Sequence, residues 1–163
     1  MARKRFDHMN CSVAQALEVL GDWWTLLLVR EAFLGTTRFK DFEHNLGIAK
    51  NILTARLDHL VARGVFSREP IEGGKHHEYR LTPMGKDLLT VVTALREWAD
   101  RWVYGKGNEP VVYRDARTGK RPPPLRIRDA KGAPIDGRDL VVEPGPGADR
   151  TTRARFRSRV ATE

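Results

Sequence analysis

The sequence predicts an α+β fold, mainly α, in which helices surround one short β-hairpin. Three observations indicate this fold. Apolar residues recur every three or four positions over much of residues 12–63, as in amphipathic helices. Two short runs that read as strands then flank a glycine-containing linker at 72–75, which is typical of a hairpin. A last apolar stripe over 83–103 predicts one long helix.

The first two helices are expected at about 12–20 and 23–34. Gly21 separates them, and a glycine at 35 is placed to end the second. This second stretch is apolar almost all round, so we expect it to be the central helix of the core. Trp23 and Trp24 stand at the start of this helix. They are expected either to belong to the core and an interface or to line a small-molecule pocket.

The next pair of helices has the spacing of a helix-turn-helix. A short helix is expected over about 40–46, followed by a turn at Gly47 and a longer helix over about 49–63. Leu53, Leu57 and other apolar residues recur along one face of the longer helix. Two helices separated by a short turn that contains glycine form the helix-turn-helix pattern.

The hairpin follows, with strands expected over 65–71 and 76–81. Thr82 then suits a helix N-cap and Pro83 the first helical position, so the long helix is expected over about 83–103. A helix-turn-helix followed by a two-stranded hairpin is a winged helix, and the hairpin tip is its wing. Wings of this kind reach a groove or a phosphate backbone beside the recognition helix.

The composition changes after Tyr104. Runs at 111–115, 125–129 and 139–143 look like short strands separated by proline- and glycine-rich segments. The stretch from 150 to 159 contains five arginines. The sequence therefore predicts a winged-helix domain for DNA binding and dimerisation over 1–104 and a β-rich extension over 105–163. The Arg-rich end of the extension is either a phosphate-binding arm or a disordered tail.

Composition limits the partners. A net charge of +8 and an isoelectric point near 10.1 favour a polyanion such as double-stranded DNA. The one cysteine, Cys11, allows neither an intrachain disulfide nor a thiolate zinc site and fits a reducing cytoplasm. No apolar run is long enough to span a membrane. Catalytic motifs are missing from the sequence, so we expect no enzyme and no cofactor.

The predicted recognition helix, 49–63, carries polar side chains near its start. Asn side chains suit adenine edges and Arg side chains suit guanine edges in the major groove. Neither Ile48 nor Ala49 offers a capping side chain, which leaves the first N–H groups open to a phosphate. The candidate DNA-contacting residues, which include the wing, are Arg38, Lys50, Asn51, Thr54, Arg56, Lys75 and His76. Lys50 and Arg56 equally fit ordinary solvated helix charges.

A histidine pair in the second strand, His76 and His77, invites comparison with a metal site. Neighbouring residues of a strand point to opposite faces, so we expect a polar wing and no metal there.

The long last helix exceeds what a chain of this size needs for its own core, so part of its stripe is expected to face another subunit. The candidate interface residues are Leu88, Val91, Leu95, Trp98 and Trp102.

Taken in order, several stretches resemble the HxlR-type transcriptional regulators, relatives of the MarR group. They are Cys11, "GDWWTLLLVRE", "RFKDF", "GIAKNILTARLDHLVARGV" and "EYRLTPMGKDL", within about residues 8–103. The resemblance implies a bacterial, cytoplasmic homodimer whose terminal helices pair the subunits and whose recognition helices enter successive major grooves. Some members sense oxidants or electrophiles through the cysteine that matches Cys11, which makes Cys11 a candidate redox sensor. An internal two-cysteine switch is excluded because there is no second cysteine.

The predicted function is therefore a sequence-specific DNA-binding transcriptional regulator that acts as a homodimer on a pseudo-palindromic operator. A small molecule or an oxidant is the kind of effector that the resemblance allows. The alternative is a winged helix used as a protein-interaction module, against which Lys50, Asn51 and Arg56 argue. A small enzyme is a third hypothesis, for which the sequence offers no constellation.

Overall fold

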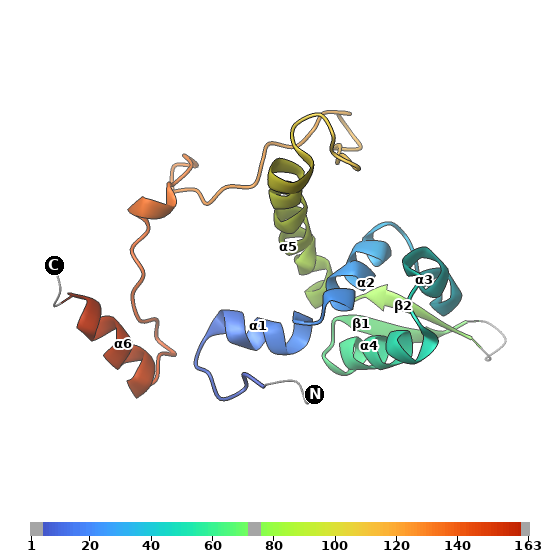
Figure 1. Cartoon of the computed structure of the whole chain (residues 1–163), viewed down its shortest axis with the longest axis horizontal. Coiled ribbons are helices and arrows are strands. Elements are labelled where there is room, and N and C mark those ends of the chain that lie inside the picture. The colour runs from blue at the N-terminus through green and yellow to red at the C-terminus, as the bar shows by residue number, and fades with distance from the viewer. Residues whose placement is uncertain (1–4, 72–75, 161–163) are drawn as a thin grey trace. The chain divides into compact units, whose positions relative to one another are not determined.

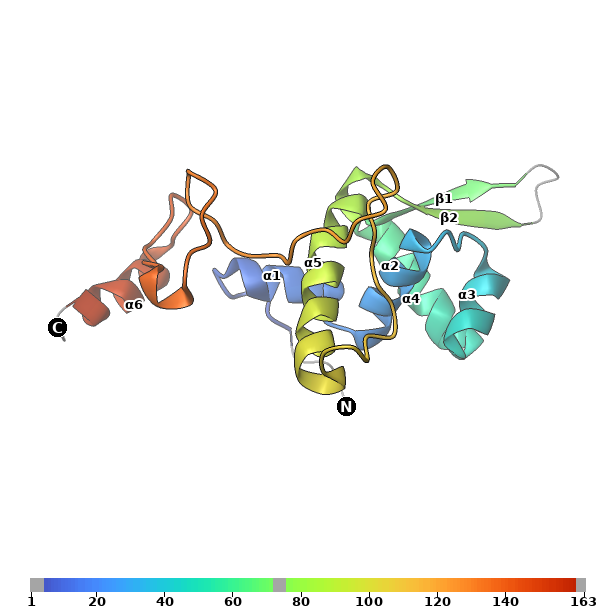
Figure 2. The same ribbon diagram turned by 90° about the horizontal axis from the view of Figure 1, so that it is seen from above.

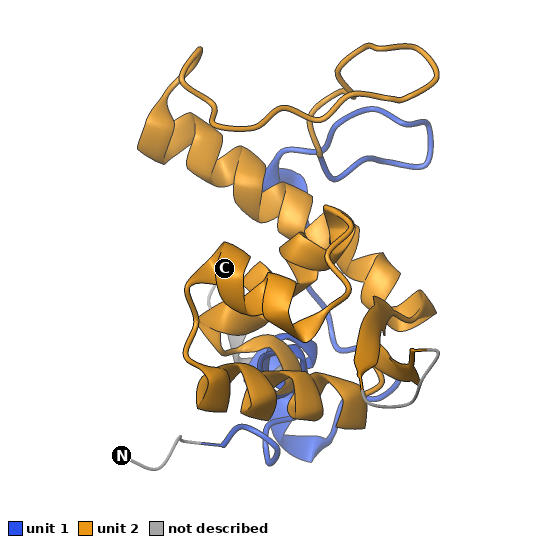
Figure 3. Ribbon diagram, turned by 90° about the vertical axis from the view of Figure 1, so that its right-hand side faces the viewer, with its two compact units in different colours: residues 1–18, 126–163 blue, residues 19–125 orange. Residues whose placement is uncertain are grey.

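The structure is a computed structural model that describes residues 5–71 and 76–160, with only the backbone for 157–160 (Figure 1). The chain divides into two compact units, which Figure 3 colours separately. Residues 19–125 form one unit, and residues 1–18 with 126–163 form the other. Helix α1 (Ser12–Leu20) crosses the boundary between them.

Residues 19–125 contain a winged helix, which confirms the predicted fold. Its helix-turn-helix precedes a hairpin and a long helix, as Figure 1 shows. The elements are α2 (Trp23–Phe33), α3 (Phe39–Leu46), α4 (Lys50–Ala62), β1 (Phe66–Pro70), β2 (His77–Leu81) and α5 (Pro83–Ala99). The predicted boundaries of α4, 49–63, differ from the observed ones by one residue at each end.

The two strands form an antiparallel hairpin that carries the wing. Phe66 pairs with Leu81 at its base, and Pro70 pairs with His77 toward its tip. Figure 2 shows β1 and β2 running side by side away from the helices. The tip that the sequence predicted to be the wing, 72–75, lies outside the described residues.

Helix α2 lies at the centre of the core, as its all-round apolar sequence predicted. It contacts α3, α4, α5 and β2. The rings of Phe42 and Phe66 meet edge to face, with centroids 6.2 Å apart. Trp24 packs against this core, whereas Trp23 is 81% exposed. The buried apolar residues of the core are Leu28, Val29, Phe42, Ile48, Leu53, Leu57, Leu60, Val65, Phe66, Tyr79 and Val92.

Helix α5 begins as predicted. Thr82 caps it, because the Thr82 hydroxyl accepts a hydrogen bond of 3.1 Å from Gly85 N. Gly85 is buried, and a β-carbon at this position would overlap the carbonyl oxygen of Val65. The α-helix ends at Ala99, earlier than expected, and continues as a π-helical turn over Asp100–Tyr104.

The expectation of a β-rich extension is wrong. None of the three predicted strands forms among the described residues. An isolated bridge between Arg128 and Pro134 and a 3-10 turn at Gly137–Asp139 are what the structure has there. Prolines lack the N–H that a β-ladder needs, and each apolar run lacks a partner strand.

The Arg-rich end, for which the sequence left a phosphate-binding arm and a disordered tail as alternatives, is helical. Helix α6 (Arg150–Val160) follows Asp149, whose carboxylate accepts a hydrogen bond of 2.7 Å from Thr152 N. In the same unit the side-chain oxygen Oδ1 of Asn10 accepts hydrogen bonds from Asp149 N at 3.1 Å and from the Thr152 hydroxyl at 2.9 Å. Asn10 thus fastens the N-terminal segment to the start of α6.

Among the residues that the structure describes, no helix combines the length and the apolar character that crossing a bilayer requires.

Candidate nucleic-acid interface

The turn between α3 and α4 is built around Gly47. Its backbone is left-handed, with φ 61°, and its N–H donates a 2.9 Å hydrogen bond to Glu43 O that closes α3. A glycine adopts this conformation without the strain that a side chain would bring. Ile48 is buried next to it and anchors the turn in the core, so the start of α4 is held firmly.

Helix α4 starts without a side-chain cap. Ala49 is extended and makes no side-chain hydrogen bond, so the first N–H groups of the helix have no side-chain partner at this residue. Lys50 and Asn51 follow with exposed side chains. The Thr54 hydroxyl donates to Lys50 O at 2.9 Å and is also exposed. A helix N-terminus that is open, exposed and flanked by a lysine favours an anion.

Arg56, one of the candidate DNA-contacting residues, forms an ion pair with Asp22. Its guanidinium Nη2 lies 2.9 Å from Asp22 Oδ2, and only 29% of its side chain is exposed. Asp22 also caps α2, because its Oδ1 accepts a hydrogen bond from Trp24 N at 3.0 Å. Arg56 therefore joins the middle of α4 to the start of α2.

A buried carboxylate, which the sequence reasoning missed, joins α2 to α3. Glu31 is 6% exposed. Its oxygens accept hydrogen bonds from Arg30 at 2.7 Å, from Asn45 at 3.1 Å and from Thr36 at 3.3 Å. Because Asn45 is in the last turn of α3, the carboxylate fixes the helix pair just before the turn. Glu31 interrupts an apolar helix, and that interruption was the available signal.

The wing is tied to the helix-turn-helix beside Arg38. Tyr79 N in β2 donates to Thr37 O at 2.8 Å, just before α3. Arg38 occupies the N-cap position of α3, but its side chain makes no capping hydrogen bond. This side chain is exposed, and its Nε lies 3.9 Å from Glu78 Oε1. Burial raises the pKa of the Tyr79 hydroxyl, so this residue is neutral at physiological pH. His76 is exposed at the end of the described wing, and Lys75 lies outside the described residues.

The outer face of α5 is apolar and open. Leu88 differs from the other four candidate interface residues, because it is half-buried and packs against the core of its own chain. The other four are exposed to 45% at Val91, 53% at Leu95, 59% at Trp98 and 70% at Trp102. These four residues, called the α5 stripe below, recur at the three- and four-residue spacing that places them on one side of a helix.

In the described part of the chain, the histidines and the cysteine do not gather into a metal site. Within residues 5–71 and 76–160, no group of three or more His, Cys, Asp or Glu is placed to hold a metal ion. His77 Nδ1 lies 3.4 Å from an Arg68 nitrogen. Cys11 is exposed immediately before α1, and its role as a redox sensor stays a prediction.

The helix-turn-helix and the hairpin lie within the region that a known protein family covers. The model of the HxlR-like helix-turn-helix family matches residues 19–106. The chain belongs to this family. The resemblance noted in the sequence is thereby confirmed.

Curated relatives of this HxlR-like chain are described as HTH-type transcriptional regulators. An HTH-type transcriptional regulator of Mycobacterium tuberculosis, MT3179, is 40% identical over 137 residues, which is 83% of this chain and 87% of the relative. YvaP of Bacillus subtilis, also an HTH-type transcriptional regulator, is 32% identical over 55% of this chain and 84% of its own length. These relatives are regulators, in agreement with the expectation that the chain is not an enzyme.

Solved structures of similar proteins extend the likeness beyond the family core. The crystal structure of PA1607, a candidate transcription factor, has a TM-score of 0.81 and 39% identity over 87% of this chain and 100% of that one. A candidate transcription factor of Pseudomonas aeruginosa, PA1374, has a TM-score of 0.63 and 32% identity over 89% and 99%. The reduced redox regulator HypR has a TM-score of 0.52 and 31% identity over 57% and 96%. The first two coverages exceed the family region, so these proteins share part of the flanking segments.

Proposed function

We propose that this HxlR-like chain regulates transcription as a homodimer that binds a pseudo-palindromic operator sequence-specifically. The observation that carries the proposal is the start of α4, where an uncapped helix end is flanked by exposed Lys50 and Asn51. A helix of this kind enters the major groove with its N-terminal residues toward the base edges.

The start of α4 offers two kinds of DNA contact. The Asn51 amide matches the donor and acceptor pattern of an adenine edge, and the Thr54 hydroxyl reaches either kind of group. Lys50 and the open N–H groups of α4 suit a phosphate. Arg38 and the wing residues Lys75 and His76 stay proposed contacts to the backbone beside that groove.

Arg56 has a different role in this proposal. Its guanidinium is held by Asp22 at 2.9 Å, and a base contact would require that ion pair to open. We therefore assign Arg56 to positioning α4 on α2. It supports the readout by Asn51 without touching the bases.

The α5 stripe supports the homodimer. Four large apolar residues on one exposed helix face are more typical of an interface than of a free surface. Two-fold related subunits would present their α4 helices to the same face of B-DNA, so the half-sites are expected about 10 bp apart or a multiple of that. Homodimerisation and this spacing rest on the same proposal.

A protein-interaction module without specific DNA binding is the alternative. A titration of operator DNA at several salt concentrations separates the two roles, because phosphate contacts make affinity fall steeply with salt. Sites enriched from random DNA supply the operator. Failure to enrich any sequence would leave the interaction module as the better reading.

Asn51→Ala is expected to weaken binding to the enriched site by about 1–3 kcal/mol and to relax preference at one adenine. Lys50→Ala should instead weaken specific and random DNA alike and reduce the salt slope by about one unit. Gel shifts over a salt series measure both effects. Lys120→Ala, an exposed lysine far along the sequence in the segment after α5, is the charge-matched control. Unchanged affinity in both α4 variants would rule out this assignment.

A double-mutant cycle tests the role of Arg56. Asp22→Asn and Arg56→Gln are each expected to lower the free energy of unfolding by about 1 kcal/mol, with a double variant little worse than either, because the two residues share one ion pair. If Arg56 positions α4, both single variants weaken operator binding to a similar extent. If only Arg56→Gln weakens binding and alters the preferred sequence, Arg56 reads a base.

A further inference from the structure

Helix α6 carries positive charge without any acidic residue of its own. Its 11 residues, 150–160, include five arginines and no aspartate or glutamate. Arg150, Arg153 and Arg155 are exposed. Like charges three or four positions apart on a helix repel one another, as at positions 150 and 153, so α6 forms against its own electrostatic field. A polyanion would remove that repulsion.

The position of Arg150 adds to this unfavourable charge. Arg150 is the first residue of α6, where the positive end of the helix dipole disfavours a cation. Among the residues that the structure describes, none forms an ion pair with Arg150. The neighbouring carboxylate, Asp149, instead accepts a hydrogen bond from Thr152 N at 2.7 Å. An anion from outside the chain would meet both the guanidinium and the helix dipole.

The arginines of α6 flank a narrow outward edge. With 3.6 residues per turn, Thr152 and Phe156 share one side of the helix, and both are half-buried. Ala154 lies roughly opposite them and is exposed. Arg150 and Arg155 lie on either side of Ala154. A helix of this form can approach a DNA groove along its small edge while its guanidinium groups reach the phosphates on each side.

The start of α6 is held in place by its own unit. Besides the bonds that Asn10 Oδ1 accepts, the Asn10 amide nitrogen Nδ2 donates to Gly147 O at 3.2 Å. Arg153 Nε donates to Ala148 O at 2.9 Å and so closes the loop before the helix. Prolines in that loop restrict its backbone further. Less conformational entropy is therefore lost when α6 binds a partner than a free tail would lose.

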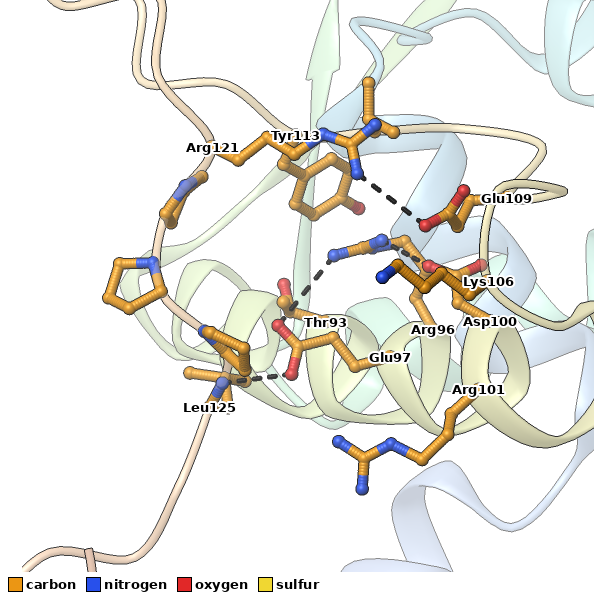
Figure 4. Close-up of a pocket in the computed structure, with 14 residues that line it drawn as sticks. Thr93, Arg96, Glu97, Asp100, Arg101, Lys106, Glu109, Tyr113, Arg121 and Leu125 are labelled. Carbon is orange, nitrogen blue, oxygen red and sulfur yellow. Dashed lines mark hydrogen bonds and ion pairs between the residues drawn. The ribbon is translucent and has the colours of Figure 1, made fainter.

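The segment after α5 limits how far α6 reaches along a bound duplex. Figure 4 shows side chains that join this segment to α5. Leu125 N donates to Glu97 Oε2 at 2.9 Å, and the Arg96 guanidinium stacks on the Tyr113 ring, 4.4 Å from its centroid. The connection from there to α6 is 126–149, which spans at most about 80 Å when fully extended. This length corresponds to roughly 20–25 bp of B-DNA.

A DNA duplex fits α6 better than an anionic membrane does. A helix that lies on a membrane buries a wide apolar face. The one aromatic residue of α6, Phe156, is already half-buried within the chain, and the exposed positions over 150–156 are arginine, threonine and alanine. Guanidinium groups pair with phosphates through two parallel hydrogen bonds, and a duplex repeats its phosphates at regular intervals.

We propose that α6 is a second DNA-contacting element, which binds the phosphates of the duplex beside the operator. It adds affinity without reading sequence, because phosphates carry no sequence information directly. The inference rests on the proposed function, since α6 binds DNA that α4 has selected. The two are distinguishable, because α4 sets the sequence preference whereas α6 makes affinity depend on the length of the flanking DNA.

Gel shifts of the full chain on the enriched site, with short flanks and with flanks of about 25 bp, are the test. Wild type is expected to bind the long DNA about tenfold more tightly, because the tethered helix adds a weak contact at a high effective concentration. Arg150→Gln/Arg155→Gln should lose this difference and reduce the salt slope on long DNA by about one to two units.

Two control variants separate the position of the charge from its amount. Arg150→Lys/Arg155→Lys keeps both charges and should retain most of the length dependence. Lys120→Gln/Lys131→Gln removes the same net charge from exposed positions outside α6 and should bind as wild type does. Circular dichroism checks the fold, which should be retained because replacing Arg150 removes a cation from the positive end of a helix.

Equal affinity of wild type for short and long DNA, or an unchanged length dependence in the Arg150→Gln/Arg155→Gln variant, would overturn the inference and leave the proposed function standing. Tighter binding to vesicles that contain phosphatidylserine than to random DNA, lost in the same variant, would make α6 a membrane-binding helix instead. A chain that enriches no sequence but keeps the length dependence through α6 would support the inference and contradict the proposed function.

Discussion

Glutamate in place of Leu95 or Trp102 is expected to convert the protein from a dimer to a monomer. Both residues are on the exposed α5 stripe, at 53% and 70% exposure in the single chain. A carboxylate buried in an apolar interface loses its hydration without gaining a partner, which costs several kcal/mol. Dimerisation should therefore weaken by about 3 kcal/mol or more, which is over about 100-fold. Operator binding should lose its cooperativity along with the dimer.

Sedimentation equilibrium at micromolar concentration measures this effect directly. Thr90→Glu is the matched control, because it places the same charge at an exposed position of α5 that is off the stripe. The control should remain dimeric and keep operator binding. A wild-type monomer with intact specific binding would refute the dimer, and a dimeric Leu95→Glu variant would place the interface elsewhere.

Alanine in place of Gly85 is expected to destabilise the fold by about 2–3 kcal/mol. Alanine normally favours a helix over glycine by about 1 kcal/mol. Here the added methyl group would overlap Val65 O and press on a Leu81 methyl group at 3.0 Å. The obstacle is a backbone atom that cannot rotate away, so α5 must shift away from Val65, the residue just before β1. Overpacking of this kind costs more than the helix propensity returns.

Urea unfolding of Gly85→Ala and of Lys86→Ala separates the two effects. Lys86 is exposed at the next position of the same helix, so its replacement should change the free energy of unfolding by less than about 0.5 kcal/mol. Greater stability of Gly85→Ala than of wild type would show that α5 has room to move from Val65.

The winged helix was predictable because its signals are local. Glycines at 21, 35, 47 and 64 mark the ends of helices, and apolar periodicity gives the buried faces of α2 and α4. Thr82 and Pro83 announce the start of α5. Such signals agree with the final structure because the core buries the same apolar faces that the sequence pattern identifies.

The ion pair of Arg56 and the irregular course of the extension could not be predicted from the sequence, for a shared reason. The spacing of α4 places Arg56 near a polar face, but its partner Asp22 lies in another helix, which no periodicity reveals. The runs at 111–115 and 125–129 have the composition of strands, but a strand requires a neighbour with free N–H and C=O groups. The sequence contains no information about that neighbour, and the prolines between the runs remove donors.

The bare start of α4 has a consequence for stability. Serine or aspartate at a helix N-cap is worth about 1 kcal/mol more than alanine, and Ala49 forgoes this. A screen for heat-resistant variants should therefore enrich Ser or Asp at position 49. The new side chain would occupy the N–H groups that a DNA phosphate is proposed to use, and aspartate would also repel the phosphate. Thermal resistance and operator affinity would then change in opposite directions at a single residue, a trade-off set by one missing hydroxyl.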